Sequence, residues 1–185
     1  MNYSTIKFND IANGEGVRTS LFVSGCTHHC KHCFNPETWD FNYGKVFDKE
    51  TEDKIILSLA PNYVNGLTLL GGEPMEPANQ KGLLPFVKRV KEMYPNKTIW
   101  CYTGYLFDEE LLRPSRARTP WTDEFLTYID ILVDGEFKID LKDITLRFKG
   151  SSNQRIIDVQ QSLKQNKVIL SPYNEKRNIN IKSTK

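Results

Sequence analysis

Short apolar runs alternate along the chain with longer stretches that have helical periodicity. The runs at residues 17–23, 66–70, 98–103 and 129–133 are rich in β-branched and apolar residues and predict four strands. Because helical patterns separate these runs, the strands are expected to be joined by right-handed crossovers. The pattern therefore predicts an α/β domain with a mostly parallel sheet.

The stretches between these runs predict the helices. Residues 48–59 begin with acidic positions and continue with apolar residues at helical spacing, and residues 79–94 repeat this spacing over a longer stretch. Shorter helices are predicted at 107–112 and 123–128. Every predicted helix lies between two predicted strands, as a parallel sheet requires.

Length and charge restrict the organisation of the chain. Its 185 residues provide one ordinary domain. The 25 basic and 23 acidic residues give a net charge of +2, too small for a nucleic-acid footprint over the whole molecule. After Ile157 the chain becomes polar and rich in Asn, Lys and Gln. We therefore predict a domain over residues 1–158 and a basic, weakly ordered tail over 159–185.

The hydropathy pattern also bears on location. No stretch approaches the roughly 18 apolar residues of a membrane span. Residues 1–10 lack the basic start and apolar run of a secretory signal. We therefore expect a cytoplasmic protein whose partners include neither a membrane nor a nucleic acid.

Three of the four cysteines lie close together, in the spacing Cys26-x3-Cys30-x2-Cys33. In a reducing compartment such crowding indicates metal or redox chemistry rather than disulfides. Each of the three thiolates can bind one iron of a cubane cluster, which leaves a fourth iron without a protein ligand. Cys101 lies alone within a predicted strand, and we expect it to be a small buried residue.

A structural zinc site is the main alternative for the cysteine loop. Its fourth ligand would come from His28, His29, His32 or Cys101. Zinc sites usually combine two pairs of ligands separated by tens of residues, and three ligands in one short loop fit that pattern poorly. An inert group of thiols is a further alternative. The spacing favours an iron–sulfur cluster.

Unusual residues also follow the other predicted strands. The run at 66–70 is followed by Gly-Gly-Glu-Pro at residues 71–74, and the later runs end at Thr103-Gly104 and Asp134-Gly135. In parallel α/β folds ligands bind at the carboxyl ends of the strands. These segments are therefore expected to share one site with the cysteine loop, although each alone reads equally well as an ordinary turn.

The cysteine spacing, together with the Gly-Gly-Glu-Pro segment, resembles the radical S-adenosylmethionine superfamily. Further segments, at residues 10–18, 22–26, 33–39 and 99–105, are similar to the activases of anaerobic ribonucleoside-triphosphate reductases. So are the later segments at 133–135 and 149–154. The resemblance extends from residue 3 to about residue 158. The loop at 113–121 is longer than is usual in the family, and residues 159–185 have no counterpart in it.

The resemblance implies a cofactor set and a reaction. Cys26, Cys30 and Cys33 would hold a 4Fe-4S cluster, and the amino and carboxylate groups of S-adenosylmethionine would chelate the open iron. Reductive cleavage would produce a 5′-deoxyadenosyl radical, which would take a hydrogen atom from a glycine of the partner. That partner would be the large subunit of an anaerobic ribonucleoside-triphosphate reductase, and the electron donor a protein such as a flavodoxin.

The resemblance also implies contacts with S-adenosylmethionine. The two glycines of the Gly-Gly-Glu segment would bring the backbone close to the methionine part, and the glutamate would accept a charge-assisted hydrogen bond from its ammonium group. The later strand ends would contact the ribose or the methionine, with turn caps as the alternative role. The full set of expected contacts is His32, Phe34, Gly71, Gly72, Glu73, Thr103 and Asp134.

The fold class implied by the resemblance is an incomplete parallel (β/α) barrel of the radical S-adenosylmethionine type. A complete eightfold barrel typically needs about 250 residues, more than this chain has, so one side would stay open to a protein substrate. Two other functions remain open: an activase of another glycyl-radical enzyme such as pyruvate formate-lyase, and a non-enzymatic metal-binding docking module.

Overall fold

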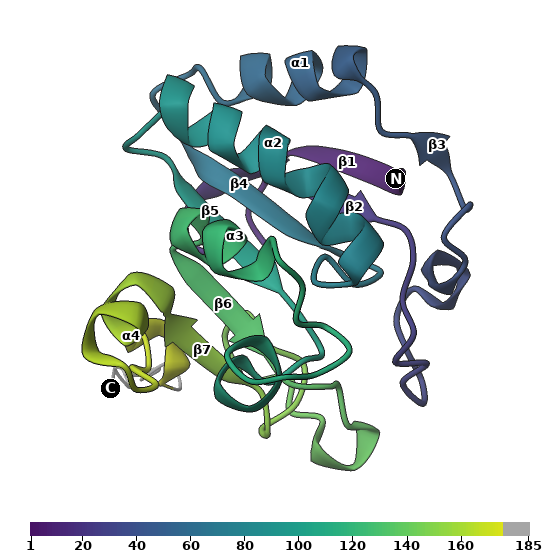
Figure 1. The fold of residues 1–185 in the computed structure, drawn as a ribbon, viewed down its shortest axis with the longest axis vertical. Helices are drawn as coiled ribbons and strands as arrows, with labels where there is room; N and C mark the ends of the chain where they lie inside the picture. The colour runs from purple at the N-terminus through teal and green to yellow at the C-terminus, as the bar shows by residue number, and fades with distance from the viewer. Residues whose placement is uncertain (176–185) are drawn as a thin grey trace, which may run out of the picture.

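A seven-stranded mixed sheet forms the centre of the protein, in a computed structural model that describes residues 1–175 (Figure 1). The strand order is β3-β1-β2-β4-β5-β6-β7. The strands are β1 (Asn2–Asp10), β2 (Val17–Val23), β3 (Lys45–Val46), β4 (Val64–Gly71), β5 (Thr98–Tyr102), β6 (Ile131–Asp134) and β7 (Arg155–Asp158). The sheet is open, with β3 and β7 at its edges.

The four predicted strands form the centre of this sheet. They are β2, β4, β5 and β6, which pair in parallel with one another, as the pattern predicts. Three further strands, β1, β3 and β7, pair antiparallel at the two sides and were not predicted. In β1 no position is fully buried, so it carries no apolar run that would mark it as a strand.

The α-helices lie where the periodicity places them, except for the last, which falls in the segment predicted to be a weakly ordered tail. They are α1 (Lys49–Ser58), α2 (Pro77–Met93), α3 (Thr122–Tyr128) and α4 (Val159–Gln165), with short helical turns η1 (Pro36–Trp39), η2 (Phe107–Leu111), η3 (Ile139–Leu141) and η4 (Pro172–Asn174). The side chain of Asp48 caps α1 by accepting from the N–H of Thr51. The predicted helix at 107–112 is a single π-helical turn. Within residues 1–175, no helix has the length and apolar character needed to cross a membrane.

The main core fills the space between one face of the sheet and α1, α2 and α3. Alternate strand residues point into it because side chains of a strand alternate between the two faces. Its fully buried members include Leu21, Leu67, Leu69, Ile99, Cys101 and Leu132 from the sheet and Leu83, Phe86, Val87 and Val90 from α2. The burial of Cys101 confirms the sequence prediction.

A smaller apolar cluster covers part of the opposite face of the sheet. Trp100, Val133 and Ile156 are buried there, and the rings of Phe148 and Tyr173 pack against them. The Trp100 ring centroid lies 5.2 Å from that of Phe148 and 5.4 Å from that of Tyr173. The rest of this face borders the cavities described below.

The structure corrects the expected start of a weakly ordered tail. Residues 159–175 form α4 and η4 and pack against the domain, with Val159 fully buried and Ile157 bridged to Leu170. The average composition of this segment hides a few apolar side chains that each fill a specific place, so composition alone predicts too little order. The predicted tail beyond residue 175 lies outside the described residues.

Candidate functional site

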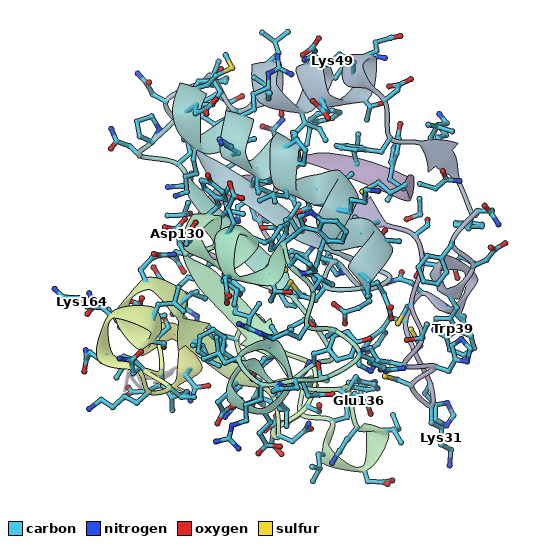
Figure 2. All side chains as sticks on the ribbon, viewed as in Figure 1. Lys31, Trp39, Lys49, Asp130, Glu136 and Lys164 are labelled. Atoms are coloured by element: carbon cyan, nitrogen blue, oxygen red, sulfur yellow. The ribbon has the colours of Figure 1, made fainter. Side chains whose placement is uncertain are left out.

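The carboxyl ends of the four parallel strands meet at one edge of the sheet. The cysteine loop follows β2, the Gly-Gly-Glu segment follows β4, and Thr103 and Gly135 follow β5 and β6. Figure 2 shows Lys31, Trp39 and Glu136 at this end of the molecule, with Asp130 and Lys49 well away from it. The parallel pairing therefore gathers the segments that the sequence marked as unusual.

A cavity of about 190 Å³ lies between these strand ends. It is lined by Cys26, Cys30, Cys33, Phe34, Gly71, Gly72, Glu73 and Thr103, and also by His28, Tyr102, Gly104, Glu136, Phe137 and Gln154. Eight of the ten residues predicted as site residues thus line one cavity. The other two, His32 and Asp134, do not line it.

A second cavity of about 420 Å³ adjoins the first along the face of the sheet opposite the main core. The two share Phe34, Asn35, Leu70, Tyr102, Phe137 and Gln154. The second cavity is also lined by Asn13 and by Phe148 and Lys149 of the loop before β7. The sequence did not predict this wall, because its segments lie more than a hundred residues apart along the chain.

The cysteine loop rests on the turn η1. The N–H of Gly25 donates to the carbonyl of Thr38 at 2.8 Å, and the N–H of Cys26 donates to the carbonyl of Trp39 at 3.2 Å. All three loop cysteines are free thiols. Burial raises the pKa of the Cys26 thiol to about 12 and raises that of Cys30 as well. A bound metal would favour the thiolates by supplying the positive charge that the surroundings lack.

Two glycines allow the end of β4 to approach the cysteine loop. The N–H of Gly72 donates to the carbonyl of Val23 at 2.7 Å. A Cβ atom on Gly72 would lie 2.7 Å from the carbonyl oxygen of Gly25, and one on Gly71 would lie 2.7 Å from that of Val23. Gly71 also has a φ of +106°, which side chains disfavour. Close approach of the backbone therefore requires glycine at both positions.

Glu73 follows these glycines and is almost fully buried, at 1% exposure. Its Oε1 accepts from the N–H of Met75 at 2.8 Å, and its Oε2 accepts from the N–H of Gly104 at 2.7 Å. Two backbone donors from different loops thus orient the carboxylate beside the cavity. A carboxylate has about four acceptor positions, so two remain for further donors.

His28 joins the cysteine loop to this carboxylate. Its Nε2 lies 3.1 Å from Oε2 of Glu73, and its Nδ1 donates to Oε1 of Glu136 at 2.7 Å. Burial opposes the charged imidazole, but the two carboxylates outweigh it and raise the pKa of His28. From the sequence, His28 was predicted only as an alternative zinc ligand. Its position between two cysteines was the one sequence feature that indicated a place in the site.

The remaining predicted residues differ in their surroundings. Phe34 is exposed and packs against Phe137 with ring centroids 5.0 Å apart, while Thr103 is buried at the cavity wall. His32 is exposed on the outside of the loop.

The carboxylate of Asp134 accepts from the guanidinium of Arg155 and from the N–H of Phe107, and it is fully buried. The structure therefore places Asp134 in an ion pair that ties β6 to β7 and to η2.

All three loop cysteines line the first cavity. Across residues 1–175, no group of three or more His, Cys, Asp or Glu side chains converges closely enough to hold a single metal ion. Three thiols that line one cavity match the ligand set of a multi-iron cluster, in which each of three irons binds one thiolate. His28 Nε2 adds a buried nitrogen atom without an aligned hydrogen-bond partner at the same place.

This arrangement defines a single-cluster iron–sulfur protein. The chain matches the family described as 4Fe-4S single cluster domain over residues 12–157. It is 47% identical over 158 residues to the anaerobic ribonucleoside-triphosphate reductase-activating protein of Haemophilus influenzae, covering 84% of this chain and 97% of that protein. The protein of the same name from Pasteurella multocida is 46% identical, with 84% and 96% covered. The one from Escherichia coli is 42% identical, with 83% and 96% covered. The chain belongs to the family of anaerobic ribonucleoside-triphosphate reductase-activating proteins.

Proposed function

We propose that this protein is an activase that cleaves S-adenosylmethionine reductively and places a radical on a glycine of an anaerobic ribonucleoside-triphosphate reductase. The observation that carries the proposal is the shared cavity, where three thiols and the Gly-Gly-Glu segment face one another. Family membership supports the same reaction. When bound, the 4Fe-4S cluster supplies the electron that cleaves S-adenosylmethionine into methionine and a 5′-deoxyadenosyl radical.

The chain's own residues bind and orient the two cofactors. Cys26, Cys30 and Cys33, which line the cavity, would hold three irons of the cluster and leave the fourth without a protein ligand, open to S-adenosylmethionine. The carboxylate of Glu73 accepts from the methionine ammonium with the acceptor positions that its two backbone donors leave free. Gly71 and Gly72 add backbone groups at the same wall, because no side chain covers them.

The adjoining cavity extends the site along the sheet. Phe34 and Tyr102 line both cavities and present apolar surface to the nucleoside, and Thr103 supplies a hydroxyl in the first cavity. The open sheet then corresponds to the incomplete parallel (β/α) barrel of the radical S-adenosylmethionine type. Its uncovered side leads to the second cavity, through which a glycine of the reductase reaches the site.

The proposal includes the surroundings in which the protein works. The large subunit of the reductase supplies the glycine, and an electron donor such as a flavodoxin supplies the electron. Both are cytoplasmic, and so is this protein. Residues 1–158 carry the cofactors and the sheet. In the segment at 159–175, Val159 adds to the main core and Tyr173 packs against Trp100.

The test is the product of the first step. Protein reconstituted with iron and sulfide under anaerobic conditions, given a strong reductant and S-adenosylmethionine, is expected to form 5′-deoxyadenosine. With the reductase subunit present, it is expected to produce a glycyl-radical doublet in the EPR spectrum. A protein that carries its cluster and forms no 5′-deoxyadenosine would contradict the proposal.

Two comparisons identify the partner and the metal. A doublet formed with a pyruvate formate-lyase and not with the reductase would assign the activase to another glycyl-radical enzyme. One zinc per chain, without broad absorption near 400 nm, would support a metal-binding docking module.

A further inference from the structure

His28 lies in the cysteine loop, and its side chain contacts residues that follow two other strands, β4 and β6. Its imidazole is 96% buried, since the side chain is only 4% exposed. One nitrogen lies 3.1 Å from Glu73 after β4, and the other donates at 2.7 Å to Glu136 after β6. The ring therefore spans the cavity wall between two loops that belong to different strands.

The loop after β5 completes the surroundings of this ring. The ring centroid of Tyr105 lies 4.3 Å from that of His28. A Cβ atom on Gly104 would lie 2.7 Å from Nε2 of His28, so the imidazole occupies the space that a side chain at position 104 would fill. The guanidinium of Arg116 lies 5.1 Å from the ring of Tyr105 and 3.4 Å from Nδ1 of His28. Contacts from three loops hold the imidazole in place.

The neighbouring histidines of the loop make no comparable contacts. His29 has a φ of +51° and is exposed, and its ring lies 4.6 Å from that of Trp39. His32 is also exposed. Three histidines that look equivalent in the sequence therefore differ in the structure, and only His28 lines the cavity.

The contact between His28 and Glu73 is important because the same carboxylate is proposed to bind the methionine ammonium group. Oε2 of Glu73 receives the backbone N–H of Gly104 on one side and faces His28 on the other. The approach of Nε2 lacks the alignment of a hydrogen bond, so it leaves acceptor positions of the carboxylate open. An arriving ammonium group then meets a carboxylate whose orientation is already determined.

We propose that His28 is a positioning residue for S-adenosylmethionine, which acts by holding the carboxylate of Glu73 and the cysteine loop at a constant separation. The inference rests on the proposed function. It assigns to His28 no contact with the reacting atoms and no role as a ligand of iron. Residues that orient a binding group typically change affinity by tenfold to a hundredfold when they are removed.

The test compares two matched variants, His28→Asn and His29→Asn. Asparagine at position 28 is too short to reach both glutamates, while at position 29 it tolerates the positive φ. Both proteins are reconstituted, and their iron content is measured first. Equilibrium binding of S-adenosylmethionine is followed by the change in the EPR spectrum of the reduced cluster, and the rate of 5′-deoxyadenosine formation is measured against its concentration.

For His28→Asn we expect unchanged iron content, a Kd and a KM for S-adenosylmethionine raised roughly tenfold, and a kcat within about twofold of the wild type. His29→Asn is expected to match the wild type in all of these values. Equal affinity in the two variants, or a loss confined to kcat, would overturn the proposal.

A double variant separates positioning through Glu73 from a general structural effect. In a Glu73→Gln background, adding His28→Asn is expected to raise the Kd no further, because both changes remove the same interaction. Additive losses would contradict positioning. If His28→Asn fails to load iron, His28→Gln replaces it, since glutamine keeps an N–H donor at longer reach. A wild-type protein that binds no S-adenosylmethionine would refute the proposed function itself, which is a different outcome.

Discussion

The paired strands β2 and β4 have one buried charged residue at each end. The two residues differ in how many of their hydrogen-bonding positions the protein itself satisfies. At the start of β2, Arg18 is 1% exposed, and just past the end of β4, Glu73 is also 1% exposed. Arg18 uses all five N–H donors on hydroxyl and carbonyl oxygens, at distances from 2.6 to 3.2 Å. Glu73 receives two aligned hydrogen bonds and borders a cavity.

This difference indicates that Arg18 stabilises the fold, whereas Glu73 is available to a ligand in the cavity. Burial lowers the pKa of Arg18 to about 10, which still leaves it protonated at neutral pH. Its acceptors are the carbonyls of Leu67 and Thr98 and other groups of the sheet, so the guanidinium cross-links strands without offering anything to a ligand. The carboxylate of Glu73 is different, because it borders a cavity and still has free acceptor positions. A ligand in the cavity can donate hydrogen bonds to these positions.

The largest effect is expected at the cysteine loop. Changing Cys26, Cys30 or Cys33 to Ala removes one cluster ligand, so we expect iron and 5′-deoxyadenosine formation to be lost together. Cys101→Ser is the control, since this thiol is fully buried in the main core. It should keep its iron while losing about 1–3 kcal/mol of unfolding free energy, because it buries a hydroxyl. Loss of iron from the Cys101 variant would show that the ligand set is different.

The next largest effect is expected at Arg18 and tests its role in stabilising the sheet. Arg18→Leu leaves several buried oxygens without donors, and we expect it to lower the free energy of unfolding by about 3 kcal/mol or more. Denaturant unfolding of the apoprotein measures this. Arg89→Leu is the control: this arginine pairs with Glu52 and Asp53 and is 32% exposed, so its loss should cost less than about 1 kcal/mol. Equal losses would contradict the structural role of Arg18.

A smaller effect is expected at Gly72 and tests the close approach of the end of β4 to the cysteine loop. Gly72→Ala places a methyl group against the carbonyl oxygens of Gly25 and Thr38, which are backbone atoms that cannot move aside freely. We expect the rate of 5′-deoxyadenosine formation to fall about tenfold or more. In Gly82→Ala the new methyl group meets only the flexible side chain of Met1, and the rate should not change. If both variants kept full activity, the cysteine loop would tolerate a wider separation from β4.

The smallest effect concerns pH and the segment before Arg18. Burial of Asp10 works against its charge, but hydrogen bonds from Ser20, Asn13 and the Ala12 N–H outweigh it and lower the pKa of this carboxyl. A lowered folded-state pKa contributes stability above the ordinary value of 3.8, and this contribution is lost as the pH falls through the folded-state value.

The difference in unfolding free energy between the wild type and Asp10→Asn should therefore shrink as the pH falls below about 4. Urea unfolding at a series of pH values measures it. A difference that stays constant with pH would show that this carboxyl is not stabilised by folding.

Much of the central fold follows from local patterns. The runs that predict β2, β4, β5 and β6 are apolar because both faces of a central parallel strand are covered, and such runs are visible without any knowledge of their neighbours. The antiparallel strands β1 and β7 lack this signal, since they are partly exposed and their pairing depends on the strand beside them. Register with a neighbour is not encoded in the periodicity of one segment.

The site shows the same division. The spacing of the cysteines and the Gly-Gly-Glu segment predicted six of the residues that line the cavity. Asp134 was expected to contact the cofactor, but Arg155 takes its carboxylate, and this pairing depends on the antiparallel register of β6 and β7. The distinct position of His28 likewise depends on two glutamates that are distant in the sequence.

The sequence by itself determined the α/β class, the parallel centre of the sheet and the position of the cysteine loop, because periodicity and cysteine spacing are local properties. Only the tertiary structure decided which buried charges cross-link strands and which face a cavity. The balance between burial and hydrogen bonding is settled by atoms that different strands bring together. Arg18 lies near the start of the apolar run at 17–23 and Glu73 lies shortly after the run at 66–70, and the folded sheet gives these two buried charges different roles.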